Sequence, residues 1–304
     1  MANIIAIVWD FDQTLVKGYM QDPIFKYYNV DSKKFWKEVS ALPDYYNQSQ
    51  HVKVNRDTIY LNHFINYTKK GIFKGLNNQM LRDFGKELTF YPGVPEIFEK
   101  TKKMIEDNPK YREFDIKVEH YIVSTGMSEI IRGSAIMPYI DDIWGCELIE
   151  DKDIDGNMIL SEIGYTIDNT SKTKALFEIN KGINKRKDLN VNSKIPHDLR
   201  RVQFSNMIYI ADGPSDVPAF SVINQYDGST LAVYPHGNYE AMKQVEQLRK
   251  DQRIDMFVEA DYQEDTTAYM WICNKILEIA EGIRDGEKEK LAKYAGNEPK
   301  HLNN

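Results

Sequence analysis

The sequence predicts an α/β fold: a mainly parallel sheet with helices on both faces, and a smaller, mostly α-helical cap domain. Short apolar runs alternate with helical patterns over most of the chain, which is typical of parallel sheets with crossover helices. Residues 19–88 differ, because they are rich in Tyr, Asn, Lys and Phe and lack a strong strand pattern. We therefore assign residues 1–18 and 89–304 to a Rossmann-like core and residues 19–88 to an inserted helical cap.

The expected strands are short apolar runs. The first, at 4–9, is apolar on both faces, which favours a place at the centre of a parallel sheet. The run at 156–167 follows a turn at Asp155–Gly156 and has the pattern of a hairpin strand. The remaining runs predict strands at 117–126, 143–151, the first part of 206–216, 229–235 and 255–262.

The expected helices have apolar residues at helical spacing. In the cap they follow plausible N-caps at Asp31 or Ser32, Asn55 and Asn77, and Gly71 is a plausible stop. The predicted helices are 32–42, 56–71, 77–88, 94–107, 127–137, 172–182 and 265–283. The polar stretch 181–202 predicts a long surface loop, and the charged tail after Arg284 predicts a frayed end.

Composition narrows the class of protein. The 304 residues include 39 basic and 46 acidic side chains, so the net charge of -7 disfavours nucleic acid or an anionic membrane as a partner. No apolar run approaches the roughly 20 residues of a membrane span, and the N-terminus lacks a signal-peptide pattern. The two cysteines, Cys146 and Cys273, lack the spacing of a zinc site or disulfide framework. We expect a soluble cytoplasmic protein with reduced thiols; the sequence leaves its oligomeric state open.

Polar residues follow the predicted strands. Asp10 and Asp12 end the first strand, Ser124 ends the second and Asp212 ends the strand within 206–216. In open parallel sheets, ligands bind at the carboxyl ends of the strands. These side chains are therefore expected to meet in one crevice.

Asp10 and Asp12 form the first candidate motif. Residues i and i+2 of an extended segment point the same way, so the two carboxylates share a side while Phe11 turns into the core. Such carboxylates repel unless a cation or a proton lies between them. One could attack phosphorus and the other could act as general acid and base. Taken alone, a strand-end turn capped by Asp explains the motif as well.

The second motif is Ser124 with the backbone N–H groups of Thr125 and Gly126. A hydroxyl, a glycine and a helix N-terminus after a strand can hold an anion such as phosphate. The third is Lys172 or Lys174, either of which could neutralise an acidic cluster from a helix start. An ordinary helix cap and a solvated lysine are the alternatives for the two motifs.

The fourth motif is the run Asp212-Gly213-Pro214-Ser215-Asp216. Paired acids on a tight turn suit a hard cation such as Mg²⁺, although an ordinary Asp-Gly-Pro turn is the alternative. Four unrelated coincidences in this order, each tied to its own element, are far less probable than any one of them.

Together these motifs resemble the four signature motifs of the haloacid dehalogenase (HAD) superfamily. They resemble its phosphatase branch, close to phosphoserine phosphatases, with a helical cap between the first and second motifs. Gln13 and Ala211 stand where that family commonly has glycine, and the stretch between Lys172 and Asp212 is longer than in compact relatives.

The resemblance implies a role for each motif residue. Asp10 would be the nucleophile and a Mg²⁺ ligand, and Asp12 the general acid and base, with its backbone carbonyl on the metal. Ser124, Thr125 and Gly126 would grip the phosphoryl group, and Lys172, rather than Lys174, would link nucleophile and phosphate. Asp212 would bind Mg²⁺, and Asp216 would support the metal or the lysine.

The expected function is a Mg²⁺-dependent phosphomonoester hydrolase that acts on a small phosphorylated metabolite through an aspartyl-phosphate. A phosphotransferase or phosphomutase would use the same residues. A C–halogen dehalogenase has no need of Asp12 or Asp212. A non-catalytic metal-binding module is the alternative outside enzymes.

Overall fold

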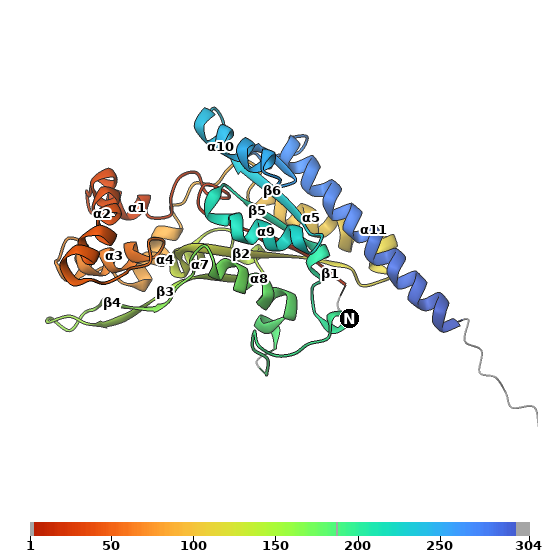
Figure 1. The fold of residues 1–304 in the computed structure, drawn as a ribbon, viewed down its shortest axis with the longest axis horizontal. Helices are drawn as coiled ribbons and strands as arrows, with labels where there is room; N and C mark the ends of the chain where they lie inside the picture. The colour runs from red at the N-terminus through yellow and green to blue at the C-terminus, as the bar shows by residue number, and fades with distance from the viewer. Residues whose placement is uncertain (1–2, 187, 296–304) are drawn as a thin grey trace, which may run out of the picture.

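The computed structural model describes residues 3–186 and 188–295, and its centre is one seven-stranded sheet (Figure 1). Its strand order is β4-β3-β2-β1-β5-β6-β7. Neighbouring strands run parallel except β3 and β4, which form an antiparallel pair. The strands are β1 (Ile4–Trp9), β2 (Lys117–Met127), β3 (Asp142–Lys152), β4 (Met158–Tyr165), β5 (Met207–Ala211), β6 (Ser229–Tyr234) and β7 (Met256–Glu259). Every predicted strand is present, and fully buried β1 lies at the centre as predicted.

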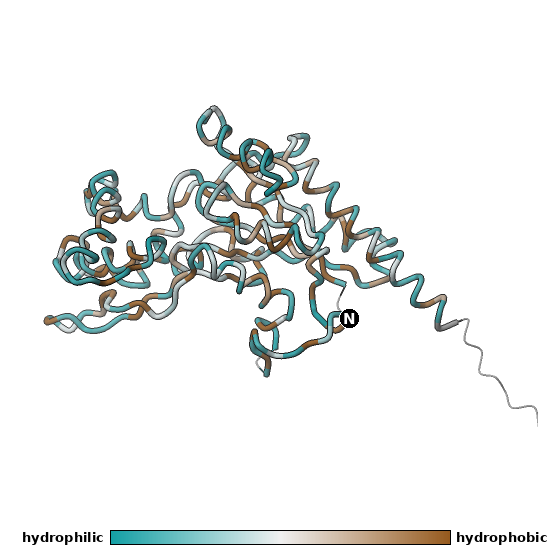
Figure 2. The backbone as a smooth tube through the Cα atoms, viewed as in Figure 1, coloured by the Kyte–Doolittle hydropathy of each residue, from teal (hydrophilic) through white to brown (hydrophobic). Residues whose placement is uncertain are grey.

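Helices cover both faces of the sheet, which confirms the predicted α/β class (Figure 1). Helices α5 and α11 pack on one face, and α8, α9 and α10 on the other. The helices of the core are α5 (Glu96–Glu106), α6 (Pro109–Arg112), α7 (Ser128–Gly133), α8 (Ser171–Lys181), α9 (Val217–Gln225), α10 (Tyr239–Lys250) and α11 (Thr267–Ala295). In Figure 2 hydrophilic and hydrophobic bands alternate along α11, as expected of a helix with one buried side.

The inserted segment folds into α1 (Asp22–Tyr27), α2 (Ser32–Gln50), α3 (Ile59–Lys69) and α4 (Asn78–Gly85). These helices gather at one end of the molecule, beside the β3–β4 hairpin (Figure 1). The side chains of Asp31 and Asn77 cap α2 and α4 as predicted, whereas α3 begins after Thr58 instead of Asn55. The exact division into cap and core stays a prediction.

Some expectations about helices were wrong. The helix predicted at 32–42 continues to Gln50, and α11 continues past Arg284 to Ala295 where a frayed tail was expected; residues 296–304 lie outside the described part. Helices α1, α6, α9 and α10 were not predicted. The first two are too short to show a helical repeat, and α10 buries only Val245 and Leu248. Within the described residues, no helix is long and apolar enough to cross a membrane.

Helices α4 and α7 approach closely through two glycines. A Cβ atom at Gly133 would lie 1.9 Å from the carbonyl oxygen of Arg82, and one at Gly85 would lie 2.1 Å from that of Ile130. These are backbone atoms of the facing segment, so the clash cannot be relieved by a side-chain rotation. The contact fixes the inserted helices on the core.

Gly133→Ala is expected to destabilise the protein by about 1–3 kcal/mol, the usual range for overpacking. Urea unfolding followed by circular dichroism measures this change. The matched control is Gly282→Ala in α11, because a Cβ atom there meets no heavy atom within 4 Å. That control should be neutral or stabilising by up to about 1 kcal/mol, since alanine favours a helix over glycine. Equal unfolding midpoints for Gly133→Ala and wild type would show that the helices can separate at little cost.

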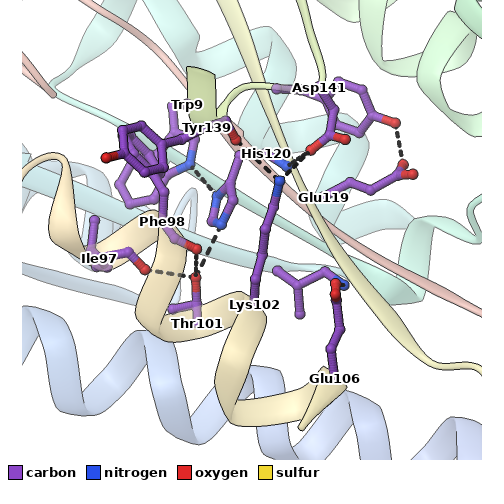
Figure 3. A network of polar contacts seen from close by, with 12 residues as sticks. Trp9, Ile97, Phe98, Thr101, Lys102, Glu106, Glu119, His120, Tyr139 and Asp141 are labelled. Atoms are coloured by element: carbon purple, nitrogen blue, oxygen red, sulfur yellow. Dashed lines mark hydrogen bonds and ion pairs between the residues drawn. The ribbon is translucent and has the colours of Figure 1, made fainter. Parts of the chain in front are cut away.

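A buried histidine joins β1, β2 and α5 (Figure 3). The indole N–H of Trp9 donates to Nδ1 of His120 at 3.1 Å, and Nε2 lies 3.0 Å from Oγ1 of Thr101. The Thr101 hydroxyl donates to the carbonyl oxygen of Ile97 at 2.7 Å, so Nε2–H of the ring donates to Thr101. A second proton, on Nδ1, would point at the indole N–H of Trp9, so the neutral ring is favoured. Burial, with a smaller effect of Lys102, lowers the pKa of His120 to about 3.

This histidine predicts a loss of stability in acid. Between pH 6.5 and 3 the unfolded chain binds a proton at His120 that the folded chain does not, so the free energy of unfolding falls as the pH falls. From pH 7 to pH 5 we expect this residue to cost about 2 kcal/mol. Urea unfolding of wild type and His120→Gln at both pH values measures it, because the stability gap between them should shrink by that amount. A gap that does not change with pH would contradict the neutral ring.

Candidate active site

Three segments far apart in the sequence meet at the carboxyl end of the sheet. Asp10 follows β1 directly, and its backbone N–H donates to the carbonyl oxygen of Ile210 in β5 at 2.8 Å. Asp212 follows β5, and Ser124 lies near the end of β2. The parallel register of β1 with both neighbours therefore brings these polar residues to one edge, as predicted.

Lys172 connects two of the carboxylates. It lies in the first turn of α8, is 1% exposed, and its Nζ lies 2.9 Å from Oδ1 of Asp10 and 2.6 Å from Oδ1 of Asp216. Burial alone would lower the pKa of Lys172, but the two carboxylates outweigh it and hold that pKa above its ordinary value. Tyr209 also donates to Oδ1 of Asp216, and Ser215 donates to Oδ2 at 2.7 Å. Asp216 is thus engaged in holding the lysine.

Lys174 lies elsewhere. Its side chain is 44% exposed and pairs with Glu178 at 3.5 Å. Residues i and i+2 of a helix point in directions about 200° apart around its axis, so only one of the two lysines can face the sheet. The structure brings Lys172, and not Lys174, to Asp10.

Three carboxylates could hold a cation. Oxygen atoms of Asp10, Asp212 and Asp216 all lie within 4.8 Å of one another. Burial raises the pKa of Asp10 to about 6, with Lys172 opposing this and Asp216 adding to it. Burial and then the charge of Asp10 raise the pKa of Asp212. An all-oxygen donor set whose members repel one another fits a hard divalent cation such as Mg²⁺.

Asp12 lies beside this group but outside it. Its Oδ1 accepts the backbone N–H of Met20 at 2.8 Å, and its side chain lines the same cavity as Asp10. Burial, followed by the charge of Asp10, raises the pKa of Asp12. This position suits exchange of a proton with a molecule in the cavity. The expected contact of its backbone carbonyl with a metal stays a prediction.

The residues expected to grip a phosphoryl group, Ser124, Thr125 and Gly126, form one turn at the end of β2, and that role stays a prediction. Ser124 is buried, and its Oγ accepts the backbone N–H of Gly126 at 3.0 Å. The N–H of Gly126 is therefore already hydrogen-bonded within the local turn, while the proton of the Ser124 hydroxyl can still be donated to another group. Thr125 and Gly126 both line the cavity, and the Thr125 carbonyl accepts the hydroxyl of Tyr60 at 2.8 Å.

These residues surround a cavity of about 260 Å³. Its sheet side contains Asp10, Asp12, Asp212 and the turn at Thr125–Gly126. Its other side includes side chains that the sequence analysis did not single out. They are Tyr19, Gln21, Trp36, Asp57 and Tyr60, and the motif neighbours Gln13 and Ser215 also line the cavity. The richness of the insert in Tyr and Phe was the available signal.

Comparison with known proteins shows which family the chain belongs to. No family model matches it. An uncharacterized protein of Borreliella burgdorferi is 39% identical over 287 residues, which span 90% of this chain and 97% of that protein. The chain belongs to the same family as this Borreliella protein.

Solved structures identify the fold. A HAD family hydrolase of Salmonella enterica serovar Typhi matches with a TM-score of 0.51 at 15% identity, covering 84% of this chain and 67% of that one. A phosphoserine phosphatase in its apo form matches with a TM-score of 0.50 at 16% identity, covering 85% and 96%. The chain has the HAD fold.

The HAD fold confirms the predicted family resemblance at the level of architecture, including the likeness to a phosphoserine phosphatase. In this HAD fold the motif residues converge as described: Asp10, Asp212, Asp216 and Lys172 come together, with Asp12, Thr125 and Gly126 around one cavity. Their chemical roles are a separate question from their positions.

Proposed function

We propose that the protein is a Mg²⁺-dependent phosphomonoester hydrolase that acts through a phosphorylated Asp10. The observation that supports this most is the buried pairing of Lys172 with Asp10, next to Asp212 and Asp216 and open to a small cavity through Asp10. An ion pair with no role beyond the surface of the protein would not need to be buried. A nucleophile for phosphorus needs a fixed carboxylate with positive charge beside it.

Asp10 and Asp212 would hold the Mg²⁺ ion, together with the backbone carbonyl of Asp12. Both oxygens of Asp216 already accept hydrogen bonds from protein groups, so Asp216 acts on Lys172 instead. When bound, Mg²⁺ supplies positive charge that offsets the repulsion between a carboxylate and a phosphate.

The chain's own residues account for the proton and phosphoryl transfers. Lys172 holds Oδ1 of Asp10, which leaves Oδ2 to attack phosphorus while the bond to the leaving oxygen breaks. Asp12 donates a proton to that oxygen and the alcohol departs. Asp12 then accepts a proton from a water molecule as its oxygen attacks the phosphorus of phospho-Asp10. Inorganic phosphate and free Asp10 are the products, and the Ser124 hydroxyl would donate to a phosphoryl oxygen.

The test is release of phosphate from a panel of small phosphate monoesters, with Mg²⁺ and with EDTA. We expect release with Mg²⁺ and loss of release with EDTA. Glycerol added as an acceptor distinguishes hydrolysis from phosphoryl transfer, because a transferase would form glycerol phosphate. Binding of Mg²⁺ without turnover of any ester would contradict the proposal and favour a non-catalytic metal-binding protein.

A further inference from the structure

We propose that the substrate is a phosphate monoester of a small amino alcohol, with a cationic ammonium group on the leaving group. This inference rests on the proposed function, because it concerns the part of the same cavity that would hold the alcohol. That part is lined by residues of the inserted segment and of the loop after β1. Charge, aromatic geometry, an unpaired acceptor and size point to the same ligand.

The charge of the cavity disfavours an anionic leaving group. Its wall contains four carboxylates, those of Asp10, Asp12, Asp212 and Asp57, and among the described residues no Lys, Arg or His lines it. Lys172 lies behind Asp10 and is engaged with Asp10 and Asp216. A carboxylate on the substrate would therefore be desolvated without a cationic partner.

The cation next to Asp57 in the chain does not line the cavity. Arg56 precedes Asp57 in the chain, yet its side chain is 73% exposed and pairs with Asp44 at 3.7 Å. Asp57 instead lines the cavity, and its Oδ2 accepts the backbone N–H of Asn169 at 3.2 Å. The insert thus presents a carboxylate and no cation to the leaving group.

Three aromatic rings line the same cavity as this carboxylate, those of Tyr19, Trp36 and Tyr60. The ring centres of Trp36 and Tyr60 are 5.7 Å apart, and those of Tyr19 and Trp36 are 6.3 Å apart; both pairs are tilted. The hydroxyl of Tyr60 is fixed by its bond to Thr125, so its ring cannot turn away. Rings of this kind around a cavity attract a cation to their faces.

Gln21 adds an acceptor without a partner. Its side chain is 3% exposed and lines the cavity, and its Oε1 accepts no hydrogen bond from the protein. A buried carbonyl oxygen without a donor costs free energy, and a turn of the Gln21 amide toward the cavity would let a ligand N–H satisfy it. An ammonium group supplies three N–H donors, whereas a carboxylate supplies none.

The size of the cavity limits the alcohol. Its volume of about 260 Å³ must hold both the phosphoryl group and the leaving group. Sites for drug-sized ligands usually have about 300–1,000 Å³. A two- or three-carbon amino alcohol fits this limit.

The experiment compares three esters that differ in one group. 2-Aminoethyl phosphate carries the ammonium, propyl phosphate has a methyl group in its place, and phosphoserine adds a carboxylate to the aminoethyl skeleton. With Mg²⁺ we expect kcat/KM for 2-aminoethyl phosphate to exceed that for each of the others by about tenfold or more. Asp57→Asn should reduce the ratio to propyl phosphate several-fold. The control Asp44→Asn changes an exposed carboxylate outside the cavity and should leave the ratio unchanged.

Calorimetric binding to the Asp10→Asn protein with Mg²⁺ separates this inference from the proposed function. Tighter binding of 2-aminoethyl phosphate than of propyl phosphate supports the cation site whether or not turnover occurs. Hydrolysis of all three esters with equal kcat/KM, or a preference for phosphoserine, would overturn the inference and leave the hydrolase standing. Equal binding of the two alkyl esters in the absence of turnover overturns it as well.

Discussion

Asp10→Asn is expected to lower kcat for every phosphate monoester by at least about 10³-fold, because an amide oxygen is a poor nucleophile for phosphorus. The side chain keeps its shape, and its amide oxygen can still accept a hydrogen bond from Nζ of Lys172, which lies 2.9 Å from Oδ1 in the wild type. The fold should therefore persist. Steady-state phosphate release measures the rate, and circular dichroism and thermal unfolding check the structure.

The control for Asp10→Asn is Asp44→Asn, which makes the same chemical change at a 75% exposed side chain outside the cavity and should retain wild-type kcat. Acid quenching during turnover, followed by mass spectrometry, should show one added phosphoryl group on the wild type and none on Asp10→Asn. Wild-type turnover by a correctly folded Asp10→Asn protein would rule out the covalent route.

The sequence was sufficient to predict the inner strands of the sheet because β1 and β5 are fully buried and β2 and β6 are mostly buried. Each residue of β1 is buried, so an uninterrupted apolar run at 4–9 has few explanations other than a central strand. Helix α10 shows the opposite case. It lies over β6 with only Val245 and Leu248 buried, and so few apolar positions do not form a recognisable repeat.

The residues of the candidate site were also predictable from the sequence only in part. Asp10 and Asp212 directly follow strands and Asp12 lies two residues after Asp10, so their convergence follows from the rule that parallel strands end at one edge. The choice between Lys172 and Lys174 depends on which side of α8 faces the sheet. Residue patterns alone left that choice open, and the family resemblance selected Lys172.

The far side of the cavity could not be predicted, because it depends on how the insert lies over the sheet. Asn55 in the insert donates to Oδ2 of Asp168 at 2.8 Å, and the two residues are 113 positions apart. The adjacent bond from Asn169 to Asp57 places that carboxylate in the cavity wall. No local pattern in the sequence specifies such long-range contacts, so Trp36 and Asp57 were not expected at the site.

Lys172→Met is expected to impair both stability and activity. Methionine has a similar length but no charge, so Asp10, Asp212 and Asp216 would face one another without the cation that now pairs with two of them. Removing one partner of a buried ion pair typically costs about 3–5 kcal/mol, and urea unfolding in EDTA should show a loss of this size. We also expect kcat/KM with Mg²⁺ to fall at least about 100-fold, because Asp10 loses the group that orients it.

Lys174→Met is the matched control, since it makes the same change two residues along α8. Lys174 is 44% exposed and its pair with Glu178 is 3.5 Å long, so its loss should alter the free energy of unfolding by less than about 0.5 kcal/mol. The comparison removes helix propensity and the loss of one unit of net charge as explanations. If Lys174→Met loses activity while Lys172→Met keeps it, the buried lysine serves only the fold, and the positive charge at the phosphoryl group must come from elsewhere.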